Sequence, residues 1–267
     1  VDVAIRLLRH AGYMAHGIDV GIWGMNMEPF AAPARWYSKL PQALASYGII
    51  NLREEASSGR AVRCAYLTDG RFNGVPAERR NRESLAVLDR LGVQSGHVHF
   101  AGNALSIPDA YLPEHMGRAS RWIDDFLKSV SGEMKIFVPA WEGGHHDHDA
   151  LHAITVGVAQ KTGRLKHVRQ FPLYNGFGLT GPLFRVFFPL AQNGAVEKTR
   201  IPLKNRVRYL RCCMGYPSQA VSWMGLFPHV LFHYFARGTQ ILQPVCAERV
   251  RQRPHPGRLY YERRGFF

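Results

Sequence analysis

The sequence is poor in cysteine and shows no disulfide framework. Its 267 residues include four cysteines: Cys64, Cys212, Cys213 and Cys246. No two of them are spaced Cys-x-x-Cys, and two are adjacent, which is unlike the pattern of a small disulfide-bonded secreted domain. We therefore expect a reducing environment and a cytoplasmic protein.

Long apolar runs are also missing. The most apolar window, Ser222–Phe235, is too short to span a bilayer and contains Pro228, His229 and His233. We expect a buried or interfacial helix there. The opening residues, VDVAIRLLRH, do not show the charged, apolar and cleavage regions of a signal peptide in order.

Acidic residues are scarce relative to basic ones. The chain has 20 Asp and Glu against 34 Lys and Arg, which gives a net charge of +14 and a pI near 10.0. A hydrophobic content of 46% with 12% aromatics excludes a disordered chain. The positive charge favours anionic partners, including an acidic membrane surface, with which peripheral contact is an open expectation. No nucleic-acid-binding motif is present, so no specific nucleic acid is expected, and the oligomeric state is not indicated.

Strand-like and helix-like patterns alternate from Arg60 onward. The strand-like segments are Arg60–Gly70, Val98–Phe100, Lys135–Ala140 and His167–Tyr174. The helical segments between and after them are Pro76–Gly92, Pro113–Val130, His148–Gly163 and Lys204–Cys213. This order predicts an α/β protein of one domain, with a Rossmann-like, mostly parallel sheet and helices on both faces.

The regularity of this pattern divides the chain into three parts. Residues 1–59 show little periodicity, although 42–59 fit the first helix of the domain. Residues 60–220 form the expected α/β domain, and 221–267 are expected to be an apolar helix followed by a basic tail.

Polar residues follow two of the expected strands. Thr68–Gly70 follows the first, and Glu142–His148 follows the third. Ligands of parallel α/β sheets bind outside the carboxyl ends of the strands, so both segments are expected at one edge. The stretch from Pro139 to His152 reads PAWEGGHHDHDALH and holds four imidazoles. It fits either a solvated loop that caps a helix or a metal site, because neutral imidazole is a common metal ligand.

Four motifs together resemble the PIG-L/LmbE-like family of zinc-dependent de-N-acetylases. They are LTDG, Arg80-x-x-Glu83 in a helix, EGGHHDHDA, and Tyr216–Gln219, and they span roughly residues 60 to 220. The resemblance implies a Rossmann-like α/β fold. It also implies hydrolysis of an N-acetyl group from an N-acetylglucosamine-type conjugate, a small and in some cases anionic amino-sugar substrate, by a Zn²⁺-activated water.

The resemblance carries over to individual residues of the His-rich run. It implies that His148 is a metal ligand, that His145 supports the charge developing on the tetrahedral intermediate, and that Asp147 orients its neighbours. Independently of the family, amide hydrolysis at neutral pH needs an activated water, and zinc lowers the pKa of bound water to about 7. Glycines before the run would let the backbone approach the substrate closely.

The family's second zinc motif, His-Pro-Asp-Asp, has no counterpart where it is expected, near Ser38–Pro41. Upstream, His16 and Asp19 have the spacing of its two metal ligands, with Ile18 in the place of the general base. They are either substitute ligands reached by an insertion or a chance pattern. In the first case, Asp147 is the nearby carboxylate that could act as the base.

Two further residues each have two interpretations. Asp69 either contacts a ligand or caps the turn with Gly70. Arg80 either binds an anionic substrate group or pairs with Glu83 along its helix. The function itself is also open between a zinc-dependent deacetylase and a degenerate relative without a competent metal site that binds carbohydrate or anions.

Overall fold

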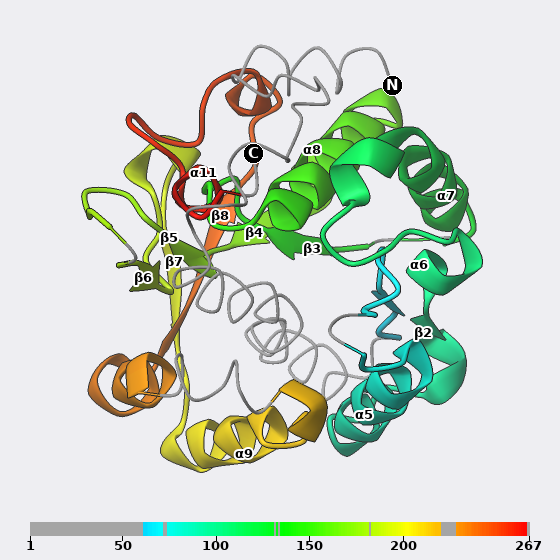
Figure 1. The fold of residues 1–267 in the computed structure, drawn as a ribbon, viewed down its shortest axis with the longest axis horizontal. Helices are drawn as coiled ribbons and strands as arrows, with labels where there is room; N and C mark the ends of the chain where they lie inside the picture. Colours follow the sequence, from blue (N-terminus) through cyan, green and yellow to red (C-terminus); the bar gives the residue numbers. More distant parts are fainter. Residues whose placement is uncertain are drawn as a thin grey trace, which may run out of the picture.

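The computed structural model describes residues 61–71, 74–130, 132, 134–181, 183–219 and 228–265 (Figure 1). The expected helix at 42–59, the Ser38–Pro41 segment and the candidate ligands His16 and Asp19 lie outside the described residues. The interpretation of these segments therefore stays a prediction.

Two parallel strand pairs form the part of the fold that the alternation predicted. Strand β1 (Cys64–Ala65) pairs with β2 (Val98–His99), and the connection between them contains helix α5 (Ala77–Arg90). Strand β3 (Ile136–Pro139) pairs with β4 (Val168–Phe171), and helix α8 (His146–Lys161) crosses between them. Helices α6 (Ala101–Ala104) and α7 (Met116–Lys128) join the two pairs.

The remaining strand pairs are antiparallel, so a mostly parallel sheet is confirmed only in part. The four-stranded sheet has the order β3-β4-β8-β7, and β8 (Thr239–Pro244) runs antiparallel to both neighbours. Strand β7 (Glu197–Arg200) ends opposite the start of β8, at the Arg200–Thr239 pair. The intervening chain, which includes α9 (Leu203–Cys213), returns at the end it left from, and such a connection makes neighbouring strands antiparallel. Strands β5 (Tyr174–Asn175) and β6 (Arg185–Val186) form a further antiparallel pair.

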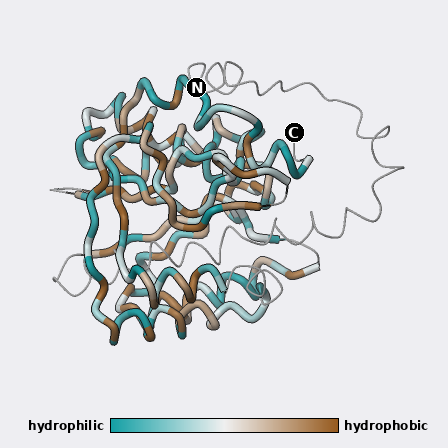
Figure 2. Tube along the Cα trace, turned by 90° about the vertical axis from the view of Figure 1, so that its left-hand side faces the viewer, coloured by the Kyte–Doolittle hydropathy of each residue, from teal (hydrophilic) through white to brown (hydrophobic). Residues whose placement is uncertain are grey.

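Helices cover both faces of the strands, as predicted. Successive side chains of a strand point to opposite faces. Phe137 of β3 accordingly packs with the apolar cluster of α5 and α9, whereas Ile136 packs with that of α7 and α8. Figure 1 shows α7 and α8 on one side of β3 and β4, and α5 and α9 on the other. Apolar and polar residues alternate along the helices at the lower edge of the molecule (Figure 2), as amphipathic helices require.

The helix boundaries follow local signals. Helix α5 starts after Pro76, buries Val87 and Leu88, and ends before Gly92, whose φ of 87° favours glycine. Helix α8 begins at His146, two residues before the predicted start, because His145 supplies the N-cap. Among the described residues, none of the helices has the length and apolarity needed to cross a membrane.

The C-terminal residues are part of the folded unit. Besides β8, the chain adds helix α11 (Tyr260–Arg263), whose Tyr260 N–H donates to the Gly143 carbonyl at 2.8 Å. The indole Nε1 of Trp141 donates to the Gln252 carbonyl at 3.0 Å. The expected basic tail thus contacts the loop between β3 and α8. Residues 228–232, from the expected apolar helix, are helical and continue into the π-helical turn η7 (His233–Arg237).

Candidate active site

The loop between β3 and α8 brings the His-rich run into the interior. Gly143 has a φ of 70°, which favours glycine. A Cβ on Gly144 would lie 1.9 Å from the Tyr174 carbonyl oxygen. The described neighbour that approaches Gly144 is therefore the backbone of β5. The glycine pair, expected to admit a substrate, is required here for packing of the chain against itself.

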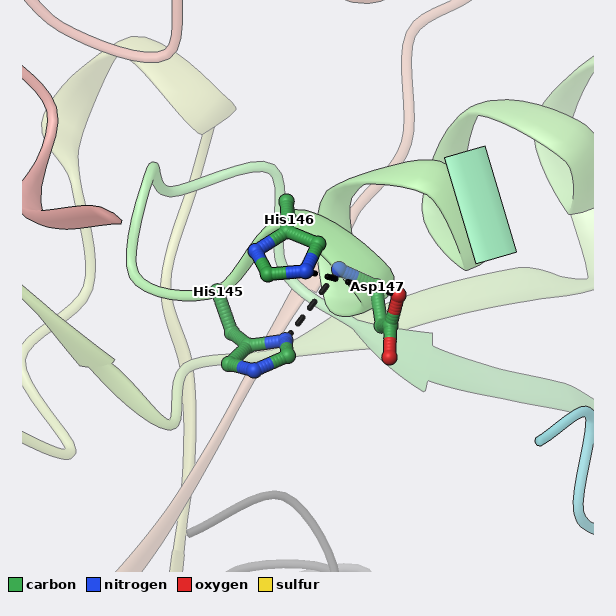
Figure 3. Close-up of side chains that lie close together, drawn as sticks. All are labelled: His145, His146 and Asp147. Atoms are coloured by element: carbon green, nitrogen blue, oxygen red, sulfur yellow. Dashed lines mark hydrogen bonds and ion pairs between the residues drawn. The ribbon is translucent and has the colours of Figure 1, made fainter. Parts of the chain in front are cut away.

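His145 caps α8 with its side chain. Its Nδ1 accepts a hydrogen bond from the Asp147 N–H at 3.2 Å, drawn as a dashed line in Figure 3. A neutral imidazole that accepts at Nδ1 carries its proton on Nε2. His145 is therefore set up to donate a hydrogen bond through Nε2 rather than to bind a metal through it. Its ring stacks on that of His146, with centroids 4.3 Å apart.

His146 and Asp147 are both held by the loop that precedes α7. The carboxylate of Asp147 accepts hydrogen bonds from Ala110 N–H at 2.7 Å and from Leu112 N–H at 3.0 Å. The Nε2–H of His146 donates to the Ala110 carbonyl at 2.8 Å. Ala110 has a φ of 71°, a conformation that is costly for a residue other than glycine and that accumulates at functional sites.

The residue before this loop, Asp109, forms a buried ion pair with Arg80. Nη1 of Arg80 lies 3.5 Å from Oδ2 of Asp109, and Thr68 Oγ1 donates to Oδ1 at 3.2 Å. Arg80 thus pairs with Asp109, whereas Glu83 receives hydrogen bonds from the backbone and side chain of Ser218. The Arg-x-x-Glu and Tyr-Pro-Ser-Gln motifs therefore meet through Glu83.

Sequence reasoning did not identify Asp109. The available signal was its position on the connection after β2, at the edge where ligands of parallel strands bind. Through Thr68 and Ala110, this connection links the end of the β1 segment to the start of α8. The prediction that Thr68–Gly70 and His145–His148 share one edge is consistent with these contacts.

Asp69 closes the turn that follows the β1 segment. Its carboxylate accepts hydrogen bonds from the backbone N–H of Arg71 at 2.9 Å and from Arg71 Nε at 2.6 Å. Gly70 has a φ of 69°. The turn-capping interpretation is therefore realised, and contact between Asp69 and a substrate stays a prediction.

Burial sets the charge state of the site. It lowers the pKa of His146 to about 4 and of His148 to about 3, and the pKa of His145 also falls well below its usual value. These imidazoles are neutral at pH 7, the form that binds metals. Burial raises the pKa of Asp147 to about 7, and burial together with the nearby Asp147 raises that of Asp109 to about 7.

Asp149 supports the loop before α8 and was also missed by sequence reasoning. Its carboxylate accepts hydrogen bonds from the N–H groups of Glu142 at 3.2 Å and Gly143 at 3.2 Å. The hydroxyl of Tyr261 donates to it at 3.1 Å. Tyr261 comes from the C-terminal residues, so nothing in the local sequence around α8 indicates this contact.

The described residues include one group suited to a metal by proximity. Ligand atoms of His145, His146 and Asp147 lie within 4.8 Å of one another, and all three side chains are buried (Figure 3). His148, the ligand implied by the family resemblance, is outside this group. Its ring lies 5.1 Å from that of His145 and 6.0 Å from that of Tyr174, measured between centroids.

The donors fit a zinc ion in chemical type. With Nε2–H held by the Ala110 carbonyl, His146 presents Nδ1 as its lone-pair nitrogen. His148 offers a neutral imidazole, and Asp147 holds an oriented carboxylate beside these rings, where it can accept a proton. His16 and Asp19 lie outside the described residues, so their distance to His148 is not tested.

Residues 45–159 match the sequence model of the family described as "PIG-L: GlcNAc-PI de-N-acetylase". This confirms the resemblance to that family over the part of the chain that holds the His-rich run. No curated protein matches the chain at the sequence level.

Three solved structures share the fold. A deacetylase–bog complex from the biosynthesis pathway of teicoplanin aligns with a TM-score of 0.56 and 17% identity, over 76% of this chain and 93% of that one. A triple mutant of a teicoplanin-pathway deacetylase (Orf2*T) gives 0.54 and 18%, over 75% and 91%. The A40926 pseudoaglycone deacetylase Dbv21 gives 0.54 and 16%, over 74% and 90%. At this identity, the likeness establishes the α/β fold alone.

Proposed function

From the match of residues 45–159 to the PIG-L family, we propose that this protein is a hydrolase that removes an N-acetyl group from an amino-sugar conjugate with the help of zinc. The observation that carries the proposal is the convergence on the loop 109–112. The side chain of Asp109 pairs with Arg80, and the backbone of Ala110 holds His146 and Asp147. A group that could recognise a substrate is thereby coupled to groups that could act on it.

Each residue has a role that its contacts support. Arg80 is buried, and its Nε and Nη2 have no hydrogen-bond partner in the part of the chain that the structure describes. A buried guanidinium with unsatisfied donors suits hydroxyl or anionic oxygens of a substrate. His145, protonated on Nε2, donates a hydrogen bond to the oxyanion that forms when the amide carbonyl is attacked.

Proton transfer falls to a carboxylate. We assign the general base to Asp147, since a pKa of about 7 suits proton transfer at neutral pH. Its two backbone donors orient the carboxylate and leave further lone pairs for the proton. Zinc bound by His148 and further protein ligands would supply an activated water and polarise the amide carbonyl. Water attack then breaks the C–N bond to yield acetate and the free amine.

An amine-release assay on N-acetylglucosaminyl conjugates tests the proposal, together with elemental analysis of the zinc content. We expect His148→Ala to lower zinc affinity sharply. His145→Ala should retain zinc and mainly slow turnover. Equal zinc retention in the two variants would contradict the division of roles between these histidines.

The second candidate function is binding without catalysis. It is favoured by the absence of a His-Pro-Asp-Asp motif near Ser38–Pro41. If the zinc-treated protein binds the conjugate but releases no amine, the degenerate-binder function replaces the hydrolase. Amine release that continues at full rate after exhaustive chelation would refute the metal requirement while leaving the hydrolase in place.

A further inference from the structure

Large apolar side chains are exposed on two neighbouring segments far along the chain from the His-rich run. On α9, Leu203 is 60%, Val207 37% and Met214, directly after the helix, 64% exposed. On residues 228–237, Phe232 is 68% and Phe235 55% exposed. The other exposed large apolar side chains of the described residues are Tyr111, Leu183 and Val196. Most of this exposed apolar surface is therefore concentrated on two elements.

The two elements are joined by Arg206. Its Nε donates to the Ile201 carbonyl at 2.7 Å, and its Nη1 donates to the Tyr234 carbonyl at 3.1 Å. Its guanidinium packs over Gly238, where a Cβ would lie 1.9 Å from Arg206 Cζ. Figure 1 shows α9 and the orange helical segment that contains residues 228–237 next to each other along the lower edge. The two elements therefore lie side by side at this edge of the molecule.

Helix α9 is amphipathic, but part of its exposed side is apolar. At about 100° per residue, Leu203, Val207 and Met214 lie within roughly 40° of one another. Lys204, Arg208 and Arg211 follow on the adjacent side, and all three are exposed. The buried side is made by Tyr209, Leu210, Cys212 and Cys213. One side of the helix thus packs into the core. Another side exposes an apolar stripe with a row of cations next to it.

The stretch of sequence that contains both elements carries charge of one sign only. Residues 198–247 contain seven Lys and Arg residues and no Asp or Glu. We define the basic–apolar face as Leu203, Val207, Met214, Phe232 and Phe235 with the cations Lys204, Arg208, Arg211 and Arg237. Arg237 is exposed at the end of η7, next to the two phenylalanines.

We propose that the basic–apolar face docks on an anionic lipid surface. Apolar side chains at the headgroup boundary combined with flanking Lys and Arg are the features of interfacial membrane-binding elements. A second copy of the chain is a poorer occupant, because a two-fold contact would bring this all-cationic region against itself. The inference does not depend on the proposed hydrolase activity.

Vesicle co-sedimentation tests the proposal with the full chain. The probes are vesicles of phosphatidylcholine alone and of equimolar phosphatidylcholine and phosphatidylglycerol, at low and high salt. We expect binding to the anionic vesicles only, weakened at high salt. Phe232→Ser with Phe235→Ser, and separately Lys204→Glu with Arg211→Glu, should each lower the partition coefficient about tenfold or more. Leu183→Ser, an equally exposed apolar side chain elsewhere, should leave it unchanged.

Far-UV circular dichroism and size-exclusion chromatography accompany each variant. The charge-reversal pair keeps the test valid if the phenylalanine pair fails to fold. No binding of the wild-type chain to anionic vesicles overturns the proposal. Loss of binding in the Lys204→Glu/Arg211→Glu variant with unchanged binding of the folded phenylalanine variant also overturns it, since the attraction would then be purely electrostatic. A wild-type dimer that the phenylalanine variant converts to monomers, without vesicle binding, assigns the face to self-association instead.

Discussion

The backbone of Ala110 holds two residues of the candidate active site while adopting a left-handed conformation. Its N–H donates to Asp147 and its carbonyl accepts from His146, at 2.7 and 2.8 Å. Its φ is 71°. Such a conformation costs about 1–3 kcal/mol for a residue other than glycine, and a β-branched side chain is tolerated there least of all. A valine at this position should therefore shift the loop and break both hydrogen bonds.

We expect Ala110→Val to lower the free energy of unfolding by about 2–4 kcal/mol, through added backbone strain and weakened hydrogen bonds. For a chain of this size, that corresponds to a Tm lower by roughly 5–15 °C. Ala110→Gly relieves the strain but gains freedom in the unfolded chain, so its stability should stay within about 1 kcal/mol of the wild type. The rate of amine release should fall in the valine variant and be retained in the glycine variant.

Urea unfolding followed by circular dichroism measures these differences. Ala104→Val is the matched control, because Ala104 is an exposed residue at the end of α6 with ordinary helical backbone. It should cost only about 0.5 kcal/mol. If Ala110→Val is no less stable than this control, the left-handed backbone does not hold the site in the way described.

Three further perturbations test separate contacts. Gly102→Ala should destabilise the fold by about 2 kcal/mol or more in thermal melts, because its Cβ would lie 2.1 Å from the Thr68 backbone. Gly96→Ala is the control and should be neutral, because nothing lies within 4 Å of its Cβ. Arg80→Met should cost about 3 kcal/mol by leaving the Asp109 carboxylate buried without its partner, and adding Asp109→Asn should recover part of that loss in a double-mutant cycle. Burial raises the pKa of Glu142 to about 8, against the effect of three donated hydrogen bonds, so the folded state binds this proton more tightly than the unfolded chain. Stability should therefore fall as the pH rises from about 5 to about 8, and Glu142→Gln should flatten that profile; an unchanged slope would exclude this carboxyl as its source.

Local signals in the sequence predicted the helices well. Helices α5, α7 and α8 lie within a few residues of the segments expected from apolar spacing, proline and glycine. The strands were predicted in place but too long. Of Arg60–Gly70, only Cys64–Ala65 pairs regularly with β2, because the chain then bends toward α6 and the turn at Asp69.

The His-rich run could be found because its residues are contiguous. A strand end, two glycines and the start of a helix form one local pattern, and that pattern carried the family resemblance. The same reasoning could not assign individual roles within the run. His145 accepts a hydrogen bond at Nδ1 only because it caps α8, and this contact determines the nitrogen that carries the proton.

By itself, the sequence determined the helices, the α/β class and the location of the candidate site, since periodicity, caps and turns act over a few residues. Only the tertiary structure decided what surrounds that site. The hydrogen bonds from Ala110 and Leu112 to Asp147 join residues 37 and 35 positions apart, and that from Tyr261 to Asp149 spans 112. The antiparallel insertion of β8 beside β4 also comes from the far end of the chain. Such contacts arise because folding brings distant backbone groups to buried carboxylates that must be satisfied, and no local pattern records which partner will arrive.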